Sequence, residues 1–484
     1  MTHLSAISLA DHNMSLGYNR NAVTAGIVHF GIGNFHRAHQ AVYCDDLLCQ
    51  GETRWGITGV SLRSSSMQEA LAPQDYLYTL AVLGRTMDCR VIGAVKDILV
   101  APQNPQAVVD RLAQSSTQLV SSTITEKGYA LKSNRVDFSH PDLAVEVTSL
   151  EAPKTIYGFL ARGLIARQSN APTSKLTIMC CDNISGGGEY LRQGVEHLLH
   201  IHSPETLVWA QGHITFVSSM VDRVCPATDD GLRAKVHKET GLKDAWPVSA
   251  EPFTQWIIEG DFAGARPAFD KVGAVFVDDI APFERMKLRY LNAAHTMAST
   301  LGHLFGDQFV HQALERKDVL TFMRQALYKN VLPNAAVPEG YNGEDYIESV
   351  ITRFQNENLP YANLQVGTDS SQKIQQRWFP TIDRALARGE DASYFEFCLG
   401  AWGVFIQTAL SQGVLNDPKR DAFKQAEQGD VLKAVIAYLE IANAQAFIFA
   451  KDAEFMGNVY QRAENIKAIG IEAALIAFLS TQKI

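Results

Sequence analysis

Short apolar runs alternate with amphipathic segments over the front half of the chain. Residues 26–30 form a β-branched run that ends in a glycine turn at Gly31 and Gly33, and an amphipathic helical pattern starts at residue 41. Such patterns are typical of a buried strand and of a helix that covers it. A second strand is predicted at residues 55–62, which completes a β-α-β unit.

The same alternation continues along the chain. Buried strands are predicted at residues 119–124 and 176–181, and helices at residues 105–112 and 158–167. Because strands that alternate with helices build parallel sheets, this part of the chain is expected to form a doubly wound α/β sheet of the Rossmann type.

The pattern changes near residue 280. Beyond it, long segments with helical periodicity dominate and few runs are typical of strands. The sequence therefore predicts an α/β protein with two domains: a Rossmann-like doubly wound sheet domain over residues 1–280 and a mostly α-helical domain over residues 281–484. The helical segments are residues 283–304, 318–329, 379–387 and 431–441.

Composition and charge narrow the class of partner. The 484 residues are 46% hydrophobic and 20% charged, which excludes a disordered or collagen-like chain. The net charge of -9 leaves no basic surface for nucleic acid or an anionic membrane. No apolar run approaches the ~20 residues that cross a bilayer, and no signal peptide is evident, so a cytoplasmic protein is expected. These patterns carry no information on oligomeric state.

Cysteine and histidine spacing does not indicate a metal site. The seven cysteines fit no disulfide framework or zinc motif, and Cys180 and Cys181 are adjacent, which usually excludes a bridge between them. The cysteines are therefore expected to be small buried residues in a reducing compartment. His36 and His39 are three residues apart, but no third ligand accompanies them. We expect no metal.

The glycine turn is the first candidate for chemistry. Gly31 and Gly33 lie between a strand and a helix, where the backbone can approach a pyrophosphate that binds the N–H groups of the helix start. The third glycine of the full fingerprint is replaced by His36. The position of the turn favours a dinucleotide site over an ordinary tight turn.

The end of the second predicted strand bears on the choice of cofactor. An acidic residue there binds the ribose 2′-hydroxyl and selects NAD. Residues 62–66 contain Arg63 and three serines, and no acid occurs before Glu69. NAD is the expected cofactor. NADP remains open, because a guanidinium beside hydroxyls also suits a 2′-phosphate.

Four polar side chains share one face of the helix predicted from residue 283. At about 100° per residue, Glu284, Lys287, Asn292 and His295 fall within an arc of about 140°. The pattern fits a catalytic face, and it equally fits a solvated face with a Glu–Lys pair.

Asn183 follows the apolar run 176–181. A side chain at the carboxyl end of a strand is well placed to hold a substrate hydroxyl or carbonyl, although an Asx turn is an equal alternative.

Four motifs together resemble the polyol-specific long-chain dehydrogenases. This family includes mannitol 2-dehydrogenase, D-arabinitol 4-dehydrogenase and fructuronate reductase (mannonate oxidoreductase), and the resemblance covers most of the chain. The motifs are G-I-V-H-F-G-I-G-N-F-H-R-A-H-Q-A at 26–41, T-E-x-G-Y at 125–129, M-V-D-R at 220–223 and K-x-R-x-L-N-x-x-H at 287–295.

The resemblance implies a zinc-independent NAD(P)-linked secondary-alcohol dehydrogenase. Lys287 would act as general base, which requires desolvation because an exposed lysine has a pKa of about 10.4. The other implied roles belong to Asn183 and Asn292, which polarise the reacting oxygen; His295, which bonds the substrate; Glu284 and Asp222, which assist proton movement; and Gly31, Gly33, Asn34, Phe35 and Arg63, which contact the cofactor.

The substrate stays open at this point. Gly187 stands where the family usually has Asn, which puts one substrate or turn contact in doubt. The segment 369–373 is similar to D-G-S-N-R of mannitol enzymes and nearer to D-G-S-Q-K of fructuronate reductases, so Lys373 could meet a carboxylate or a terminal hydroxyl. Both mannitol/fructose and D-mannonate/D-fructuronate are kept. A dinucleotide-binding redox sensor or scaffold without turnover is the alternative, and the Lys287 set argues against it.

Overall fold

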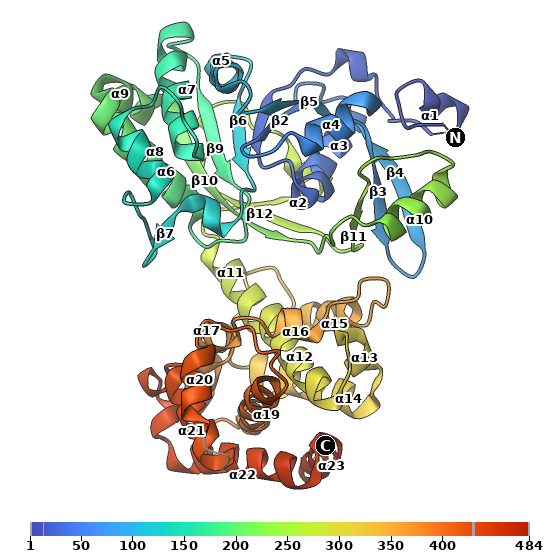
Figure 1. The fold of residues 1–484 in the computed structure, drawn as a ribbon, viewed down its shortest axis with the longest axis vertical. Coiled ribbons are helices and arrows are strands. Elements are labelled where there is room, and N and C mark those ends of the chain that lie inside the picture. The colour runs from blue at the N-terminus through green and yellow to red at the C-terminus, as the bar shows by residue number, and fades with distance from the viewer. Residues whose placement is uncertain (1, 13, 428–430, 483–484) are drawn as a thin grey trace. The chain divides into compact units, whose positions relative to one another are not determined.

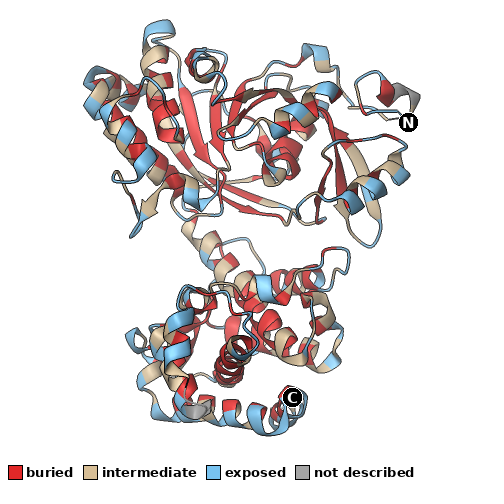
Figure 2. Ribbon diagram, viewed as in Figure 1, coloured by how far each residue is buried: buried red, intermediate tan, exposed pale blue. Residues whose placement is uncertain are grey.

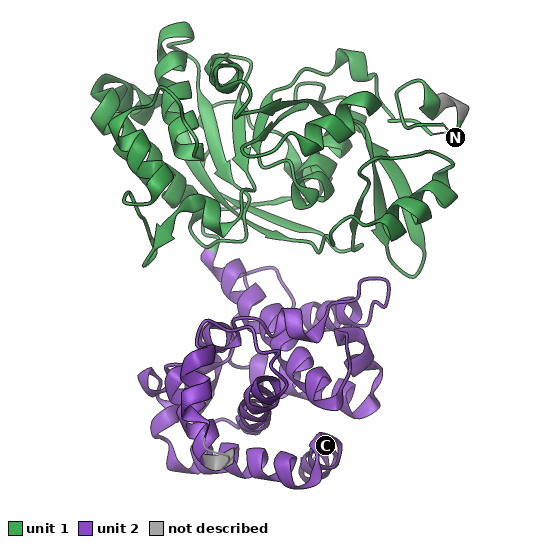
Figure 3. Ribbon diagram, viewed as in Figure 1, with its two compact units in different colours: residues 1–280 green, residues 281–484 purple. Residues whose placement is uncertain are grey.

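The computed structural model describes residues 2–12, 14–427 and 431–482. The chain forms two compact units, Met1–Ile280 and Ala281–Ile484 (Figure 3). The first is an α/β unit and the second is helical, which confirms the predicted fold class.

An eight-stranded sheet organises the first unit, in the order β13-β12-β10-β9-β6-β1-β2-β5 (Figure 1). Its strands are parallel except where β10 meets β12. The sheet strands are β1 Ile27–Phe30, β2 Ile57–Ser61, β5 Val95–Val100, β6 Leu119–Ser122, β9 Leu176–Cys180, β10 Ile214–Asp222, β12 Gln255–Glu259 and β13 Val275–Val277.

Buried apolar clusters cover both faces of this sheet. Successive residues of β1 point to opposite sides of the sheet, so neighbouring residues belong to different clusters. Ile27 belongs to a buried cluster with helix α3, whereas Val28 belongs to another with helices α5, α7 and α8. Burying each large apolar side chain stabilises the unit by roughly 1.5–3 kcal/mol. The helices of this unit are α1 Ser8–Asp11, α2 Asn34–Ala38, α3 Gln40–Cys49, α4 Ser66–Leu71, α5 Pro105–Ala113, α6 Pro141–Thr148, α7 Ile156–Asn170, α8 Gly187–His202, α9 Pro204–His213 and α10 Asp230–Thr240.

Helix starts in this unit follow their capping residues. The Asn104 side chain accepts a hydrogen bond from the Ala107 N–H at the start of α5, where Pro105 occupies the first helical position. Thr155 accepts from the Gly158 N–H at the start of α7. These local signals explain why both helices begin close to the predicted residues.

Nine strands of the described residues of the first unit were not predicted, and four of them, β5, β10, β12 and β13, belong to the large sheet. A separate sheet has the order β11-β3-β4, and β7 pairs with β8 in a short hairpin. In the sheet β11-β3-β4, strand β11 comes from a segment far along the chain from β3, so no local sequence pattern predicts their pairing. These strands are β3 Tyr78–Leu83, β4 Met87–Ile92, β7 Leu131–Lys132, β8 Arg135–Val136 and β11 Val248–Ala250.

The second unit packs its helices around one extensive core. Helix α19, Ser393–Ser411, is buried on nearly all sides and lies among the other helices of this unit (Figure 2). Among the described residues of this unit, π-turns occur at Leu288–Asn292 and Leu327–Val331, within or at the end of segments for which the sequence predicts a continuous α-helix. The remaining helices are α11 Ala281–Lys287, α12 Ala293–Phe305, α13 Val310–Glu315, α14 Lys317–Ala326, α15 Gly343–Phe354, α16 Asn363–Val366, α17 Ser370–Arg377, α18 Phe379–Ala387, α20 Arg420–Ala426, α21 Val431–Ile441, α22 Ala453–Ile469 and α23 Ile471–Thr481.

Candidate active site

The glycine turn lies at the topological switch point of the large sheet. Strand β1 is flanked by β2 on one side and by β6 on the other, so the chain leaves β1 in one direction and later returns to its other edge. Ligands of open α/β sheets bind beyond the carboxyl ends of strands at such a point. Gly31 follows the last residue of β1 and is therefore placed for ligand binding.

The two positions of the turn are glycine for different physical reasons. Gly31 has φ 95°, and a Cβ there would stand 2.1 Å from the Thr123 carbonyl oxygen, so the fold itself requires glycine. Gly33 has φ −79°, and a Cβ there would meet nothing within 4 Å. The space over Gly33 is open where a pyrophosphate would approach the backbone, so the turn fits a dinucleotide.

The residues after the turn hold the loop in place. The Asn34 amide nitrogen donates to the Pro226 carbonyl and to the Thr228 hydroxyl, both at 3.1 Å, and its oxygen accepts from Arg37 at 2.7 Å. The Phe35 ring stacks on His39, with 5.0 Å between ring centroids. The Asn34 side chain is thus bonded within the protein, and what this segment can offer a cofactor is its backbone N–H groups at the start of α2.

His36 occupies the place of the third glycine without opening the turn. Its ring is fully buried and stacks on His29 of β1 with centroids 3.4 Å apart. A third glycine normally allows close packing of helix and strand. Here two flat rings make that contact.

The turn after β2 exposes Arg63. Its neighbours include Ser65, whose hydroxyl donates to Glu69 at 2.6 Å. Glu69 is therefore bonded to its own helix start, and the Arg63 guanidinium is the charged group that this turn presents to solvent.

The loops after β6 and β9 are joined by Asp182, which sequence reasoning missed. Its carboxylate accepts hydrogen bonds from the Ile124 and Thr125 N–H groups, both at 2.9 Å, and from the Tyr129 hydroxyl at 2.6 Å. Burial raises the pKa of Asp182. Thr125 is held at φ 68°, a strained value for a β-branched residue, and such strain is concentrated at functional sites. The Cys-Asp-Asn sequence at the end of a predicted strand was the signal from which Asp182 could have been identified as a site residue.

Asn183 and Asp222 lie at the carboxyl ends of neighbouring strands. Asn183 follows β9 and is exposed, whereas Asp222 ends β10 and is 5% exposed. The adjacent Arg223 guanidinium donates to the Ala38 carbonyl at 2.7 Å and to the Glu251 carbonyl. Arg223 therefore ties the end of β10 to the end of α2.

A π-turn changes the geometry of the lysine helix in the second unit. An i→i+5 turn takes up one residue more than an α-turn, which turns every later residue back by about 100°. The straight-helix estimate of about 140° for Glu284, Lys287, Asn292 and His295 was therefore wrong. With the π-turn Leu288–Asn292 the four fall within about 80°. Lys287 is only 8% exposed, which fits the desolvation that a general base needs.

Arg377 holds the end of the π-turn. Its guanidinium donates to the Asn292 carbonyl at 3.2 Å and to the Thr296 hydroxyl at 2.7 Å. Burial lowers the pKa of Arg377 to about 10. Lys373, one turn earlier on α17, is half-buried; its ammonium donates to the Val366 carbonyl at 3.1 Å, and burial together with the charge of Arg377 lowers its pKa.

His295 is framed by aromatic rings. It stacks on Phe354 with 4.6 Å between centroids and meets the edge of Tyr361 at 5.0 Å. These contacts fix the plane of the imidazole.

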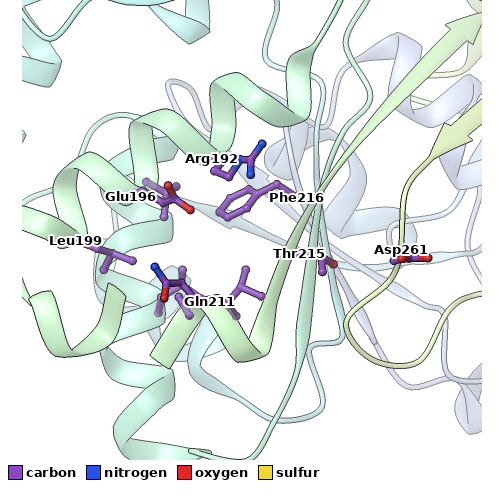
Figure 4. Close-up of a pocket in the computed structure, with 11 residues that line it drawn as sticks. Arg192, Glu196, Leu199, Gln211, Thr215, Phe216 and Asp261 are labelled. Carbon is purple, nitrogen blue, oxygen red and sulfur yellow. The ribbon is translucent and has the colours of Figure 1, made fainter. Parts of the chain in front are cut away.

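A hollow of about 350 Å³ elsewhere in the first unit does not belong to this site (Figure 4). Ile214, the first residue of β10, lines it, so it opens at the amino end of the strands. The glycine turn lies at the carboxyl ends, and none of the predicted site residues lines the hollow. Figure 4 labels Arg192, Glu196, Leu199, Gln211, Thr215, Phe216 and Asp261 around it.

Within the part of the chain that the structure describes, no three His, Cys, Asp or Glu side chains gather as a metal site. His36 and His39 are both buried among rings of the first unit. Among the cysteines, Cys49 is exposed, contrary to the expectation of buried thiols. No helix of the described residues is long and apolar enough to span a bilayer.

Comparison with known proteins decides the family. Residues 25–271 match the family model for the mannitol dehydrogenase Rossmann domain, and residues 279–467 match that for the mannitol dehydrogenase C-terminal domain. The chain belongs to the mannitol dehydrogenase family. It is therefore an oxidoreductase of that class, and the predicted resemblance is confirmed.

Individual members of the family are similar over most of their length. The structure of Pseudomonas fluorescens mannitol 2-dehydrogenase in a ternary complex with NAD and D-mannitol superposes with a TM-score of 0.80 at 33% identity, covering 99% of this chain and 100% of that one. Mannitol 2-dehydrogenase of Phaeosphaeria nodorum is 32% identical over 95% of this chain and 82% of its own length. A polyol:NADP oxidoreductase of Gluconobacter oxydans is 34% identical over 85% of this chain and 86% of its own.

Proposed function

We propose that the chain is an NAD-dependent dehydrogenase that interconverts a polyol with its ketose, with D-mannitol and fructose as the pair. Residues 1–280 form the dinucleotide-binding domain, and residues 281–484 form the substrate and catalytic domain. The observation that carries the proposal is the π-turn Leu288–Asn292 of the lysine helix; a helical wheel that allows for it supports one polar face, with Glu284, Lys287, Asn292 and His295 within an arc of about 80°.

The chain's own residues divide the reaction between them. The nearly buried Lys287 amine takes the proton of the reacting hydroxyl, and the Asn183 and Asn292 amides bond the oxygen as negative charge develops on it. His295, with its ring plane fixed, orients the substrate, while Glu284 and Asp222 carry the proton onward. A bound nicotinamide would supply the acceptor for the hydride that leaves the carbon bearing this hydroxyl.

Cofactor contacts are proposed at the glycine turn. The backbone of Gly31, Gly33, Asn34 and Phe35 receives the pyrophosphate, which the open space over Gly33 supports. NAD is the proposed cofactor because the similar Pseudomonas fluorescens structure holds it. The exposed Arg63 leaves NADP as the competing cofactor, and a relative named for NADP supports retaining that comparison in the assay.

Substrate preference is proposed for the neutral pair. The similar proteins described above are named for mannitol or polyols, and the Lys373 ammonium already bonds the Val366 carbonyl. A sugar acid would need that cation for its carboxylate. D-mannonate and D-fructuronate are therefore the second substrate pair to be assayed.

Initial rates test this proposal directly. Fructose, fructuronate, tagaturonate and xylulose are each offered with NADH and with NADPH, and the highest kcat/KM is expected for fructose with NADH. Tight NADH binding with no turnover on any ketose would instead favour a redox sensor.

The role of Lys287 is tested by substitution. Lys287→Ala is expected to leave the Kd for NADH nearly unchanged and to lower kcat by at least about 10²-fold, the usual contribution of a general base. Lys317→Ala removes an exposed lysine at the start of α14 and serves as the matched control. An unimpaired kcat in Lys287→Ala would refute the assignment.

A further inference from the structure

A chain of hydrogen-bonded side chains links strand β6 to the carbonyl oxygen of the glycine turn. The Thr123 hydroxyl bonds the Gly31 carbonyl at 2.8 Å and His29 Nε2 at 2.8 Å. His29 Nδ1 lies 2.7 Å from the Ser121 hydroxyl, which in turn lies 2.8 Å from the Gln40 amide. His29, Ser121 and Gln40 are each no more than 1% exposed, so water does not complete the bonds among these three residues, whereas Thr123 is half-buried.

Counting protons gives the direction of every bond. A carbonyl can only accept, so the single Thr123 proton goes to Gly31, and Thr123 must accept from His29 Nε2–H. Neutral His29 then has a bare Nδ1, which accepts the single proton of Ser121. Ser121 must in turn accept from an N–H of Gln40.

This direction requires the Gln40 amide to present nitrogen, not oxygen, to Ser121. With oxygen toward Ser121, the buried Gln40 Nε2 has no hydrogen-bond partner. Amide oxygen and nitrogen have nearly the same shape, and their assignment follows from the bonding network. Turning the amide therefore gives the buried nitrogen a partner and completes the proton count, and it moves the amide oxygen, which is not a donor, to the position without a partner.

The alternative, a His29 cation that donates from both nitrogens, is disfavoured by its surroundings. His29 is fully buried, and its ring stacks on His36 at 3.4 Å. The charged group that follows on α2 is the Arg37 cation, which does not stabilise a second positive charge. Burial lowers the pKa of His29 to about 3.

We propose that His29 is a positioning residue for dinucleotide binding, acting as the neutral Nε2–H tautomer through Thr123 on the Gly31 carbonyl. This inference rests on the proposed function of the turn. The peptide group is planar and trans, so fixing the Gly31 carbonyl also fixes the Ile32 N–H in the opposite direction. The Gly33 N–H donates to the same carbonyl at 2.7 Å, which makes that oxygen the centre of the turn.

Replacing the hydroxyl that joins the relay to the turn is the direct test. Thr123→Val keeps the shape and removes the hydroxyl, and is expected to raise the Kd for NADH about three- to tenfold, the typical worth of one hydrogen bond. Thr123→Ser keeps the hydroxyl and is expected to stay within about twofold of the parent. In steady state the KM for NADH should rise more than the KM for the ketose.

Ser122→Ala is the matched control. The Ser122 hydroxyl lies one residue before Thr123, is as buried as Ser121, bonds the Tyr129 hydroxyl at 2.8 Å and takes no part in the relay. Ser122→Ala is expected to lower Tm without changing the Kd for NADH. A Thr123→Val protein that binds NADH like the parent, or a Thr123→Ser protein weakened as much as Thr123→Val, would overturn the proposal.

The tautomer of His29 gives a readout that needs no ligand. With ¹⁵N-labelled histidine, and with His29→Gln to assign the signal, the ring of His29 should show the neutral Nε2–H form at pH 7 and at pH 5. An Nδ1–H form or a cation would overturn the relay even if Thr123→Val fails to fold. Absence of NADH binding by the parent protein would refute the proposed function and leave this measurement to decide the relay.

Discussion

Gly33→Ala separates ligand binding from folding at the glycine turn. Alanine adopts φ −79° without strain, and a Cβ at this position meets no atom within 4 Å. The free energy of unfolding is therefore expected to stay within about 0.5 kcal/mol of the parent or to rise slightly, because alanine restricts the unfolded chain more than glycine does.

The same methyl group fills the space where the pyrophosphate approaches the backbone. Losing one hydrogen bond between an N–H and a charged phosphate oxygen costs about 1.5–3 kcal/mol, which corresponds to about a tenfold to hundredfold rise in the Kd for NADH. Gly31→Ala is the contrasting variant. Its φ of 95° alone costs about 1–2 kcal/mol, and the 2.1 Å approach to the Thr123 carbonyl must also be relieved by backbone movement.

Two measurements decide between these outcomes. NADH fluorescence titration gives Kd, and thermal unfolding gives Tm for each variant. We expect Gly33→Ala to lose binding with an unchanged Tm, and Gly31→Ala to lose several degrees of Tm. A folded Gly33→Ala protein with the Kd of the parent would show that the dinucleotide does not lie over this turn.

Three further predictions concern pH, the π-turn and metal. Burial raises the pKa of Asp45 from 3.8 to about 6. The free energy of unfolding is therefore highest below pH 3.8, where Asp45 is protonated in both states, and falls as the pH rises to about 6, because the folded protein disfavours the charged form. Because Asn can accept the same bonds from Tyr18 and Gly93, Asp45→Asn should be more stable by up to about 3 kcal/mol at pH 7, a gain that vanishes near pH 4 in chemical unfolding; a pH-independent difference would contradict this. Arg377→Met should lower kcat at least about tenfold through loss of the bond to the Asn292 carbonyl, leave the Kd for NADH unchanged and be partly rescued by Arg377→Lys, whereas normal turnover would show that the π-turn holds without it. Prolonged chelation should leave the initial rate unchanged, and inactivation reversed by zinc would contradict a metal-free mechanism.

Half of the strands of the large sheet, β1, β2, β6 and β9, could be predicted because they are short, apolar and bounded by local turn signals. Residues 26–30 and 176–181 were predicted as strands, and β1 and β9 lie within them. The sheet β11-β3-β4 could not, because β3 is completed by a strand more than 160 residues later, and pairing at that separation leaves no local signal.

The candidate site was predictable where one segment carries it. Gly31 and Gly33 announce the turn by themselves, but their supports Thr123 and Asp182 come from other strands and could not be placed by spacing. The grouping of Lys287 with Asn292 was underestimated because a helical wheel assumes an unbroken α-helix. No residue type in Leu288–Asn292 marks the π-turn.

The π-turn lies between the half of the lysine helix that packs in the core and the half that carries Lys287. Packing and the direction of the Lys287 side chain are therefore set separately. The rotation of α12 is locked by the core, since residues such as Ala294, Met297 and Leu301 are almost fully buried. The azimuth of Lys287 relative to that anchored half depends on how many residues intervene. Inserting or deleting a single amino acid there would swing the amine by about 100° without disturbing the packed half, so chain length in this short stretch acts as a tuning element for the chemistry.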